Sequence, residues 1–178
     1  MWRYYSKRIY DDKCMIYKKS WKYILIKDDT YYCIRRGYYR PKAIKDFSSI
    51  SKGDIGGFID GYHNLSQNGN CWVGNSAIVS GNSIVYDNAK VFNKAIIYGN
   101  AQIYEDAKVF GKAMVNSANA KVSEESARIF GKSKIFGNAQ ISGHAIIYDN
   151  AQVCGNATIY GNAHICGNTI VKEFMANA

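Results

Sequence analysis

The sequence predicts an all-β fold, a parallel β-solenoid of triangular cross-section with a small β-rich cap at its N-terminal end. Three observations predict it. An aliphatic residue stands at every sixth position, a small residue stands two positions before most of these, and a longer pattern recurs every third six-residue unit. The chain has 178 residues, of which 47% are hydrophobic, enough for one domain with a core.

The six-residue unit begins with Val or Ile in all 17 units from Val73 to Val171. Its fifth residue is Ala, Ser or Thr except in the last unit, which has Met175, and the units that begin at Val115 and Val122 are one residue longer. Because side chains alternate in direction along a strand, the fifth residue and the next first residue point into the same narrow interior. The apolar spacing of three and four that indicates a helix does not occur.

The longer pattern predicts three sides. Phe92-Asn93-Lys94 is followed by Phe110-Gly111-Lys112 and then by Phe130-Gly131-Lys132, three units later each time. Three units per coil give about six coils, each rising ~4.8 Å. Positions three and four, commonly Gly-Asn, form the corners, where Asn tolerates a left-handed backbone conformation. We therefore expect lysine at position four to be conformationally less favourable.

Hexads such as Ile97–Gln102 and Ile159–His164 follow the order aliphatic, two variable residues, Asn, a small residue and a variable one. Over about residues 67–172 the chain thus resembles the hexapeptide-repeat superfamily. The resemblance implies a left-handed parallel β-helix with three hexads per coil. Because such proteins commonly form trimers, it also implies a homo-oligomer, with a trimer favoured.

Two segments before the repeats carry a second resemblance. Gly53-Asp54-Ile55-Gly56-Gly57-Phe58 and Asn64–Val73, which contains Asn-Leu-Ser and Gly-Asn-Cys-Trp-Val, are similar to a junction in phage and bacterial proteins. Those proteins join a small N-terminal region to hexapeptide repeats and are often described as polymer-forming or acyltransferase-like. The resemblance implies the fold and no particular activity.

We predict two regions, a basic β-rich cap over residues 1–60 and the β-helix over residues 61–178. The first 60 residues hold 14 Lys and Arg against 7 Asp and Glu, within a total net charge of +9. Lys22–Lys27 and Tyr31–Arg35 are expected to be strands joined at Asp28-Asp29. A small antiparallel sheet of this kind would cover the first coil.

Composition excludes several classes of protein. The five cysteines are odd in number and form no CxxC pair, so we expect neither a disulfide framework nor a metal site, and no cofactor. No run of 18 apolar residues predicts a membrane-spanning helix, and the first residues lack the apolar segment of a signal peptide. These features predict a cytoplasmic protein with no membrane partner, in the host cytoplasm if a phage encodes it.

One side of the prism concentrates positive charge beside aromatic rings. Outward residues occupy positions six and two of adjoining units, and the corner adds position four. On this side, which we call the cation–phenyl face, six cations surround three phenyl rings. The members are Lys90, Phe92, Lys94, Lys108, Phe110, Lys112, Arg128, Phe130 and Lys132.

Stacked like charges repel, so the cation–phenyl face is unfavourable unless anions offset it. Cations beside rings are typical of surfaces that bind phosphates and bases. Two alternatives remain open at this point. Asp87, Glu105 and Glu124 on the same coils could neutralise the lysines, and duplication of one coil would copy Lys and Phe together.

A second side, which we call the apolar face, is expected to be covered by another copy of the chain. Its residues are Ile78, Ile96, Tyr98, Met114, Phe136 and Ile170. If prisms pack side by side, the clefts between them become ligand sites.

The favoured hypothesis is a non-catalytic binding protein that captures a small anionic, nucleotide-like ligand rather than extended nucleic acid; one form would be a phage-type sponge against host nucleotide signalling. The alternatives are a hexapeptide-repeat acyltransferase that uses acyl-CoA, with His144 as general base, and a structural, polymer-forming scaffold. No loop protrudes from the repeats, and no Ser-His-Asp spacing or Gly-rich phosphate loop occurs, which disfavours catalysis.

Overall fold

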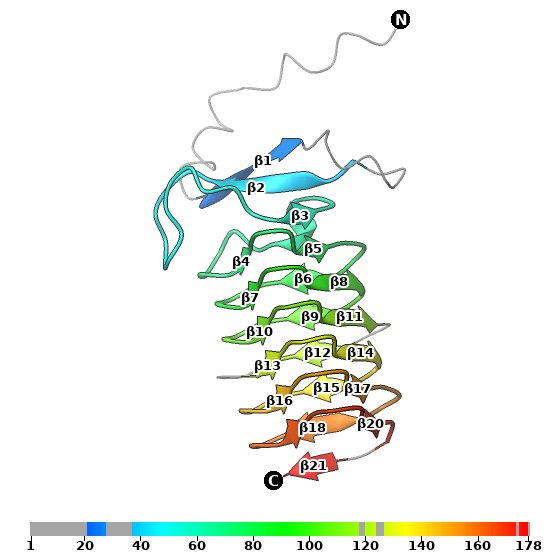
Figure 1. Cartoon of the computed structure of the whole chain (residues 1–178). Coiled ribbons are helices and arrows are strands. Elements are labelled where there is room, and N and C mark those ends of the chain that lie inside the picture. Colours follow the sequence, from blue (N-terminus) through cyan, green and yellow to red (C-terminus); the bar gives the residue numbers. More distant parts are fainter. Residues whose placement is uncertain (1–20, 28–36, 118–119, 124–126, 174, 178) are drawn as a thin grey trace, which may run out of the picture.

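The computed structural model describes residues 21–27, 37–117, 120–123, 127–173 and 175–177. Its coils stack into a prism beneath a pair of antiparallel strands, and the chain ends in the last coil (Figure 1). The predicted parallel β-solenoid of about six coils is confirmed, because successive strands pass in turn through three sheets. The left-handedness of the coil stays a prediction.

Three sheets form the sides of the prism. The first contains β1 (Tyr23–Lys27), β2 (Tyr39–Ala43), β3 (Phe58–Ile59), β5 (Ile78–Val79), β8 (Ile96–Gly99), β11 (Met114–Ser117), β14 (Lys134–Gly137), β17 (Gln152–Val153) and β20 (Ile170–Val171). The second contains β4 (Trp72–Val73), β7 (Lys90–Val91), β10 (Lys108–Val109), β13 (Arg128–Ile129), β16 (Ile146–Ile147) and β19 (His164–Ile165). The third contains β6 (Ile84–Val85), β9 (Gln102–Ile103), β12 (Lys121–Val122), β15 (Gln140–Ile141), β18 (Thr158–Tyr160) and β21 (Met175–Asn177).

The aliphatic first positions stack directly on one another. Val109 pairs with Val91 on one side and with Ile129 on the other, although the second pair spans the two longer units. The extra residues therefore leave the register of the aliphatic columns intact. Those columns are fully buried from Val73 to Ile159, together with the small residues at position five.

The corners take their left-handed backbone at position three, not at position four. Asn93 has φ 63°, Gly111 75° and Gly131 73°, whereas Lys94 and Lys112 have no positive φ. The expectation that lysine is strained at position four is therefore wrong. Position three makes the sharp turn, so it takes Gly, Asn or an acidic residue, while position four has an ordinary conformation that lysine adopts freely.

Asparagine side chains form ladders along the corners. In each pair the amide nitrogen donates to the side-chain oxygen of the asparagine one coil further on, at 3.0–3.3 Å. The pairs are Asn70–Asn88, Asn75–Asn93, Asn82–Asn100, Asn138–Asn156 and Asn150–Asn168. Asparagine at the corners thus links neighbouring coils through its side chain.

The cap joins the prism through the first sheet. β1 pairs antiparallel with β2, β2 pairs antiparallel with β3, and β3 pairs parallel with β5. The strand expected at Tyr31–Arg35 lies outside the described residues, and the described partner of β1 is β2. The sheet runs across the boundary predicted between residues 60 and 61, just before the short 3-10 helix η1 (Tyr62–Asn64). Within the described residues, no helix is long and apolar enough to cross a membrane.

Candidate ligand-binding face

The cation–phenyl face lies on the second sheet. β7, β10 and β13 begin at Lys90, Lys108 and Arg128, and these three residues are in register. Each is followed two residues later by a phenylalanine, and position four of the same coil carries Lys94, Lys112 or Lys132. The solenoid therefore brings all nine predicted residues to one side of the molecule.

The phenyl rings form a continuous stack. The ring centroids of Phe92 and Phe110 are 5.2 Å apart with an interplanar angle of 3°, and those of Phe110 and Phe130 are 4.9 Å apart at 9°. Tyr148 continues the stack at 5.4 Å and 13°. Because a ring inserted between two others would need about twice this stacking distance, the middle rings offer a ligand their edges alone. A flat ligand can stack only at an end of the column.

The six cations make no ion pair with any carboxylate in the part of the chain that the structure describes. The Lys90 ammonium instead lies 3.3 Å from the hydroxyl oxygens of Ser48 and Ser49. Asp87 and Glu105 stand at position three of another corner, where the Glu105 amide donates to the Asp87 carboxylate at 3.4 Å. Glu124 lies outside the described residues. Within the described residues, Asp87 and Glu105 therefore form no direct ion pair with the six cations.

Lysine on this face replaces an asparagine ladder. Lys94, Lys112 and Lys132 occupy the same column as Asn150 and Asn168, whose side chains hydrogen-bond at 3.3 Å. Three coils of this column thus exchange a stabilising amide ladder for three exposed ammonium groups. Since asparagine fits the corner, the lysines are not a requirement of the backbone.

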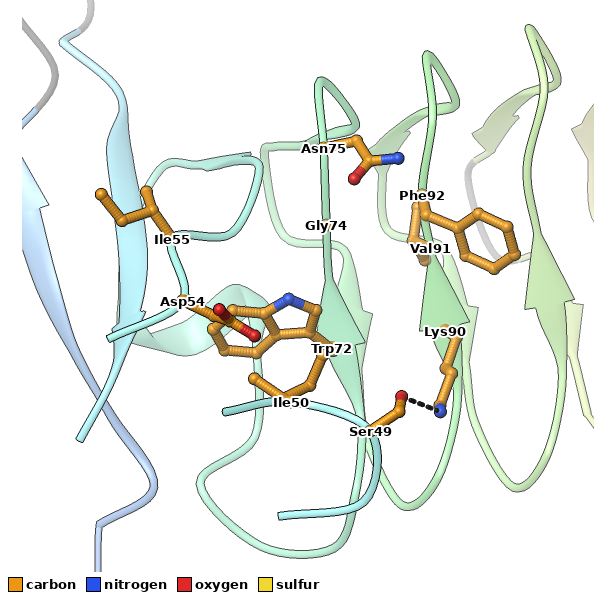
Figure 2. A pocket seen from close by; sticks show the side chains of 10 residues that line it. All are labelled: Ser49, Ile50, Asp54, Ile55, Trp72, Gly74, Asn75, Lys90, Val91 and Phe92. Carbon is orange, nitrogen blue, oxygen red and sulfur yellow. Dashed lines mark hydrogen bonds between the residues drawn. The ribbon is translucent and has the colours of Figure 1, made fainter. Parts of the chain in front are cut away.

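A pocket of about 530 Å³ opens at the N-terminal end of the ring stack, between the cap and the first two coils (Figure 2). Its lining residues come from the cap loop, from the coil of β4 and from the coil of β7. They are Ser49, Ile50, Asp54, Ile55, Trp72, Gly74, Asn75, Lys90, Val91 and Phe92. The pocket therefore includes two predicted residues, Lys90 and Phe92.

The sequence did not predict that the other pocket residues lie together. Asp54 and Trp72 belong to the two junction segments, which come together only in the folded structure. For Gly74, the sequence did contain a feature that could have indicated a pocket. This glycine occupies position two on the cation–phenyl face, where each of the next four coils carries an aromatic ring.

The predicted apolar face lies on the first sheet. Ile78, Ile96 and Met114 are consecutive in register, but Lys134 and Gln152 separate Met114 from Ile170 in the same column. Tyr98 and Phe136 lie in a second column, on either side of Asn116. Phe136 is 37% exposed and Ile170 is 55% exposed. The apolar surface is therefore densest over β5, β8 and β11.

His144 lies at a corner, where its amide donates to the Gly161 carbonyl at 2.8 Å, and its exposed ring makes no hydrogen bond within the described residues. Cys71, Cys154 and Cys166 are free thiols, while Cys14 and Cys33 lie outside the described residues. Among the residues that the structure describes, no group of three or more His, Cys, Asp and Glu could hold a metal ion.

Fold and surface together define a parallel β-solenoid protein with a cap and one basic, aromatic side. Comparison with known families supports this class. The family model of the YdcK β-solenoid repeat matches residues 139–152 and 151–167, two overlapping stretches in the C-terminal half of the prism. No curated protein matches the chain.

Proposed function

We propose that this β-solenoid is a non-catalytic binding protein that captures a small anionic, nucleotide-like ligand on its cation–phenyl face. The observation that carries the proposal is the set of six cations, stacked in register beside aromatic rings and unpaired with carboxylates in the described structure. A bound phosphate would relieve the repulsion between these charges, because each anionic oxygen can accept hydrogen bonds from neighbouring coils.

The rigid prism favours binding because little conformational entropy is lost when the ligand arrives. In the proposed assembly, the apolar face packs against another copy of the chain, with a trimer favoured, and the ligand sites lie beside the clefts between prisms. A protein of this kind could act as a phage-type sponge that withdraws a nucleotide signal from the host.

Thermal unfolding with a panel of nucleotides tests the proposal. A ligand at about 100 times its Kd stabilises the folded state by ~2.7 kcal/mol, so the melting temperature should rise with one member of the panel. Replacing Lys94, Lys112 and Lys132 together by Asn should abolish that rise. The variant should fold normally, since the new residues extend the Asn150–Asn168 ladder.

A control of equal charge replaces Lys42, Lys121 and Lys172 by Asn, because these exposed lysines lie away from the cation–phenyl face. This control should keep the ligand-induced rise. A rise that survives in the first triple variant would contradict the assignment of the face. Turnover of acetyl-CoA that disappears in His144→Ala would favour the acyltransferase instead, and concentration-dependent filaments would favour the scaffold.

A further inference from the structure

We propose that the pocket at the cap binds a nucleobase, which stacks on Phe92 in the space above Gly74. The inference rests on the proposed function for the anionic part of the ligand and adds the place and chemistry of its ring. Figure 2 shows Trp72 and Phe92 on either side of Gly74, on neighbouring coils of the second sheet.

The first argument is the missing ring of the stack. Phe110 covers one face of Phe92, and the other face is turned toward the coil of β4, where Gly74 has no side chain. A Cβ atom at Gly74 would lie 3.9 Å from the Cβ atom of Phe92, so the two residues are true neighbours in one column. A flat ring at this position would meet the phenyl face of Phe92 and would have the Trp72 indole as its other neighbour.

The second argument is the Trp72 side chain. Trp72 is 6% exposed and lines the pocket, and its indole N–H makes no hydrogen bond with any residue that the structure describes. Phe47 and Tyr23 pack edge-on against the indole at centroid distances of 5.5 Å and 6.3 Å, which hold it in one orientation. Since no buried side-chain nitrogen of the described residues lacks a partner, this N–H reaches the surface of the pocket, where an acceptor atom of a ligand can take the place of water.

The third argument is the polarity of the lining. Asp54 has a carboxylate that accepts one hydrogen bond, from the Ser51 amide at 2.9 Å, and Lys90 carries an ammonium at the same pocket. A carboxylate disfavours a purely anionic ligand and accepts hydrogen bonds from an exocyclic amino group. The geometry therefore assigns the amino edge of a base to Asp54 and the phosphate to Lys90 and the cations beyond it.

The junction segments of the sequence meet at this pocket. Gly56 lies so close to the next coil that a Cβ atom there would be 2.4 Å from the Val73 carbonyl oxygen and 3.0 Å from the Trp72 ring. This close approach places Asp54 and Ile55 over the first coil, opposite Trp72. The glycines after Asp54 thus serve to bring the acidic wall of the pocket against its aromatic wall.

The test is Gly74→Phe, which fills the pocket with the missing ring. Gly74 has no positive φ, and a new Cβ atom would be 3.3 Å from Trp72 Cδ1, so the indole must shift by a few tenths of an ångström against Phe47 and Tyr23. Calorimetric titrations should use AMP, GMP, CMP and UMP, their nucleosides, and ribose 5-phosphate. We expect the amino-bearing nucleotides to bind best and to lose affinity by about tenfold or more in Gly74→Phe, while ribose 5-phosphate binds equally to both proteins.

The matched control is Cys166→Phe, which adds a ring at the other end of the stack, beyond Tyr148, and should leave binding unchanged. Nucleotide affinity that is unchanged in Gly74→Phe, or equal to that of ribose 5-phosphate, would overturn the base site and leave the anion-binding function standing. Nucleosides that bind as tightly as nucleotides, and only when Gly74 is present, would support the base site and contradict the anion-binding function. Absence of binding by every member of the panel would overturn both.

Discussion

At the scale of single residues, Lys22 anchors the cap to the first coil. It is 2% exposed, and its ammonium donates to the carbonyl oxygens of Asn68, Gly69 and Cys71 at 2.9–3.2 Å. The Cys71 sulfur lies 3.1 Å from the same nitrogen. Burial lowers the pKa of Lys22 and raises the pKa of the Cys71 thiol. Hydrogen bonds to carbonyl oxygens offset the desolvation of the amine.

Lys22→Met should lower the free energy of unfolding by about 1–3 kcal/mol, because buried carbonyl oxygens lose their donor. Urea denaturation at pH 7 and pH 9 measures the effect. Since the pKa of Lys22 is lower in the folded state, the unfolded chain binds more protons on this group as pH approaches 10.5. The stability of the wild type relative to the variant should therefore grow with pH. Lys42→Met, at an exposed position on β2, is the control, and an equal loss there would contradict the anchoring role.

At the scale of the elements, most strands of the solenoid pair over only two residues, so their stability comes from stacking rather than from strand length. Each coil contributes aliphatic and small side chains to one continuous core. Position five is where we expect a larger side chain to destabilise the core most. Ala107 is fully buried beside the columns of Val109 and its neighbours, so a branched side chain there would have to displace them.

Ala107→Leu should destabilise the protein by about 1–3 kcal/mol through overpacking, which lowers the melting temperature by several degrees. Differential scanning calorimetry measures the shift. Lys108→Leu places the same side chain on the outer surface one residue later and should leave the melting temperature nearly unchanged. If both variants melted at the wild-type temperature, the interior would be looser than the stacked coils indicate.

At the scale of the whole molecule, the three sides of the prism differ in chemistry because each sheet collects every third unit of the chain. The second sheet carries the cation–phenyl face, and the first carries the apolar face over β5, β8 and β11. The cap covers one end of the prism through hydrogen bonds that continue the first sheet. The assembly that we propose therefore packs prisms side by side and adds no copy at the capped end.

The mass in solution tests this packing. We expect the wild type to be an oligomer at micromolar concentration, and Phe136→Glu to reduce its mass, because Phe136 is an exposed ring on the apolar face and a carboxylate cannot be buried there unpaired. Light scattering after size-exclusion chromatography gives both masses. Gln140→Glu, on the exposed side of β15, is the charge-matched control. A wild type that is already monomeric would refute the assembly.

The repeat pattern alone predicts the solenoid, its interior and the residues that share each face. Neighbour relations in a repeat protein follow from the local period, so Val91 lies over Val109 and Phe92 over Phe110 once the period is known. The nine residues of the cation–phenyl face could be grouped for the same reason. Their role in binding is not contained in the period and stays a proposal.

The corner conformation, the spacing of the rings and the pocket become visible only in the folded chain. Backbone angles at positions three and four depend on how the chain turns between sheets. The conformational preference of Asn alone therefore assigned the left-handed conformation to position four, whereas it occurs at position three. The pocket arises where the non-repeating cap meets the first coil and sets Asp54 against Trp72. Contacts of that kind join segments with no shared period, so they exist only after the cap has docked on the prism.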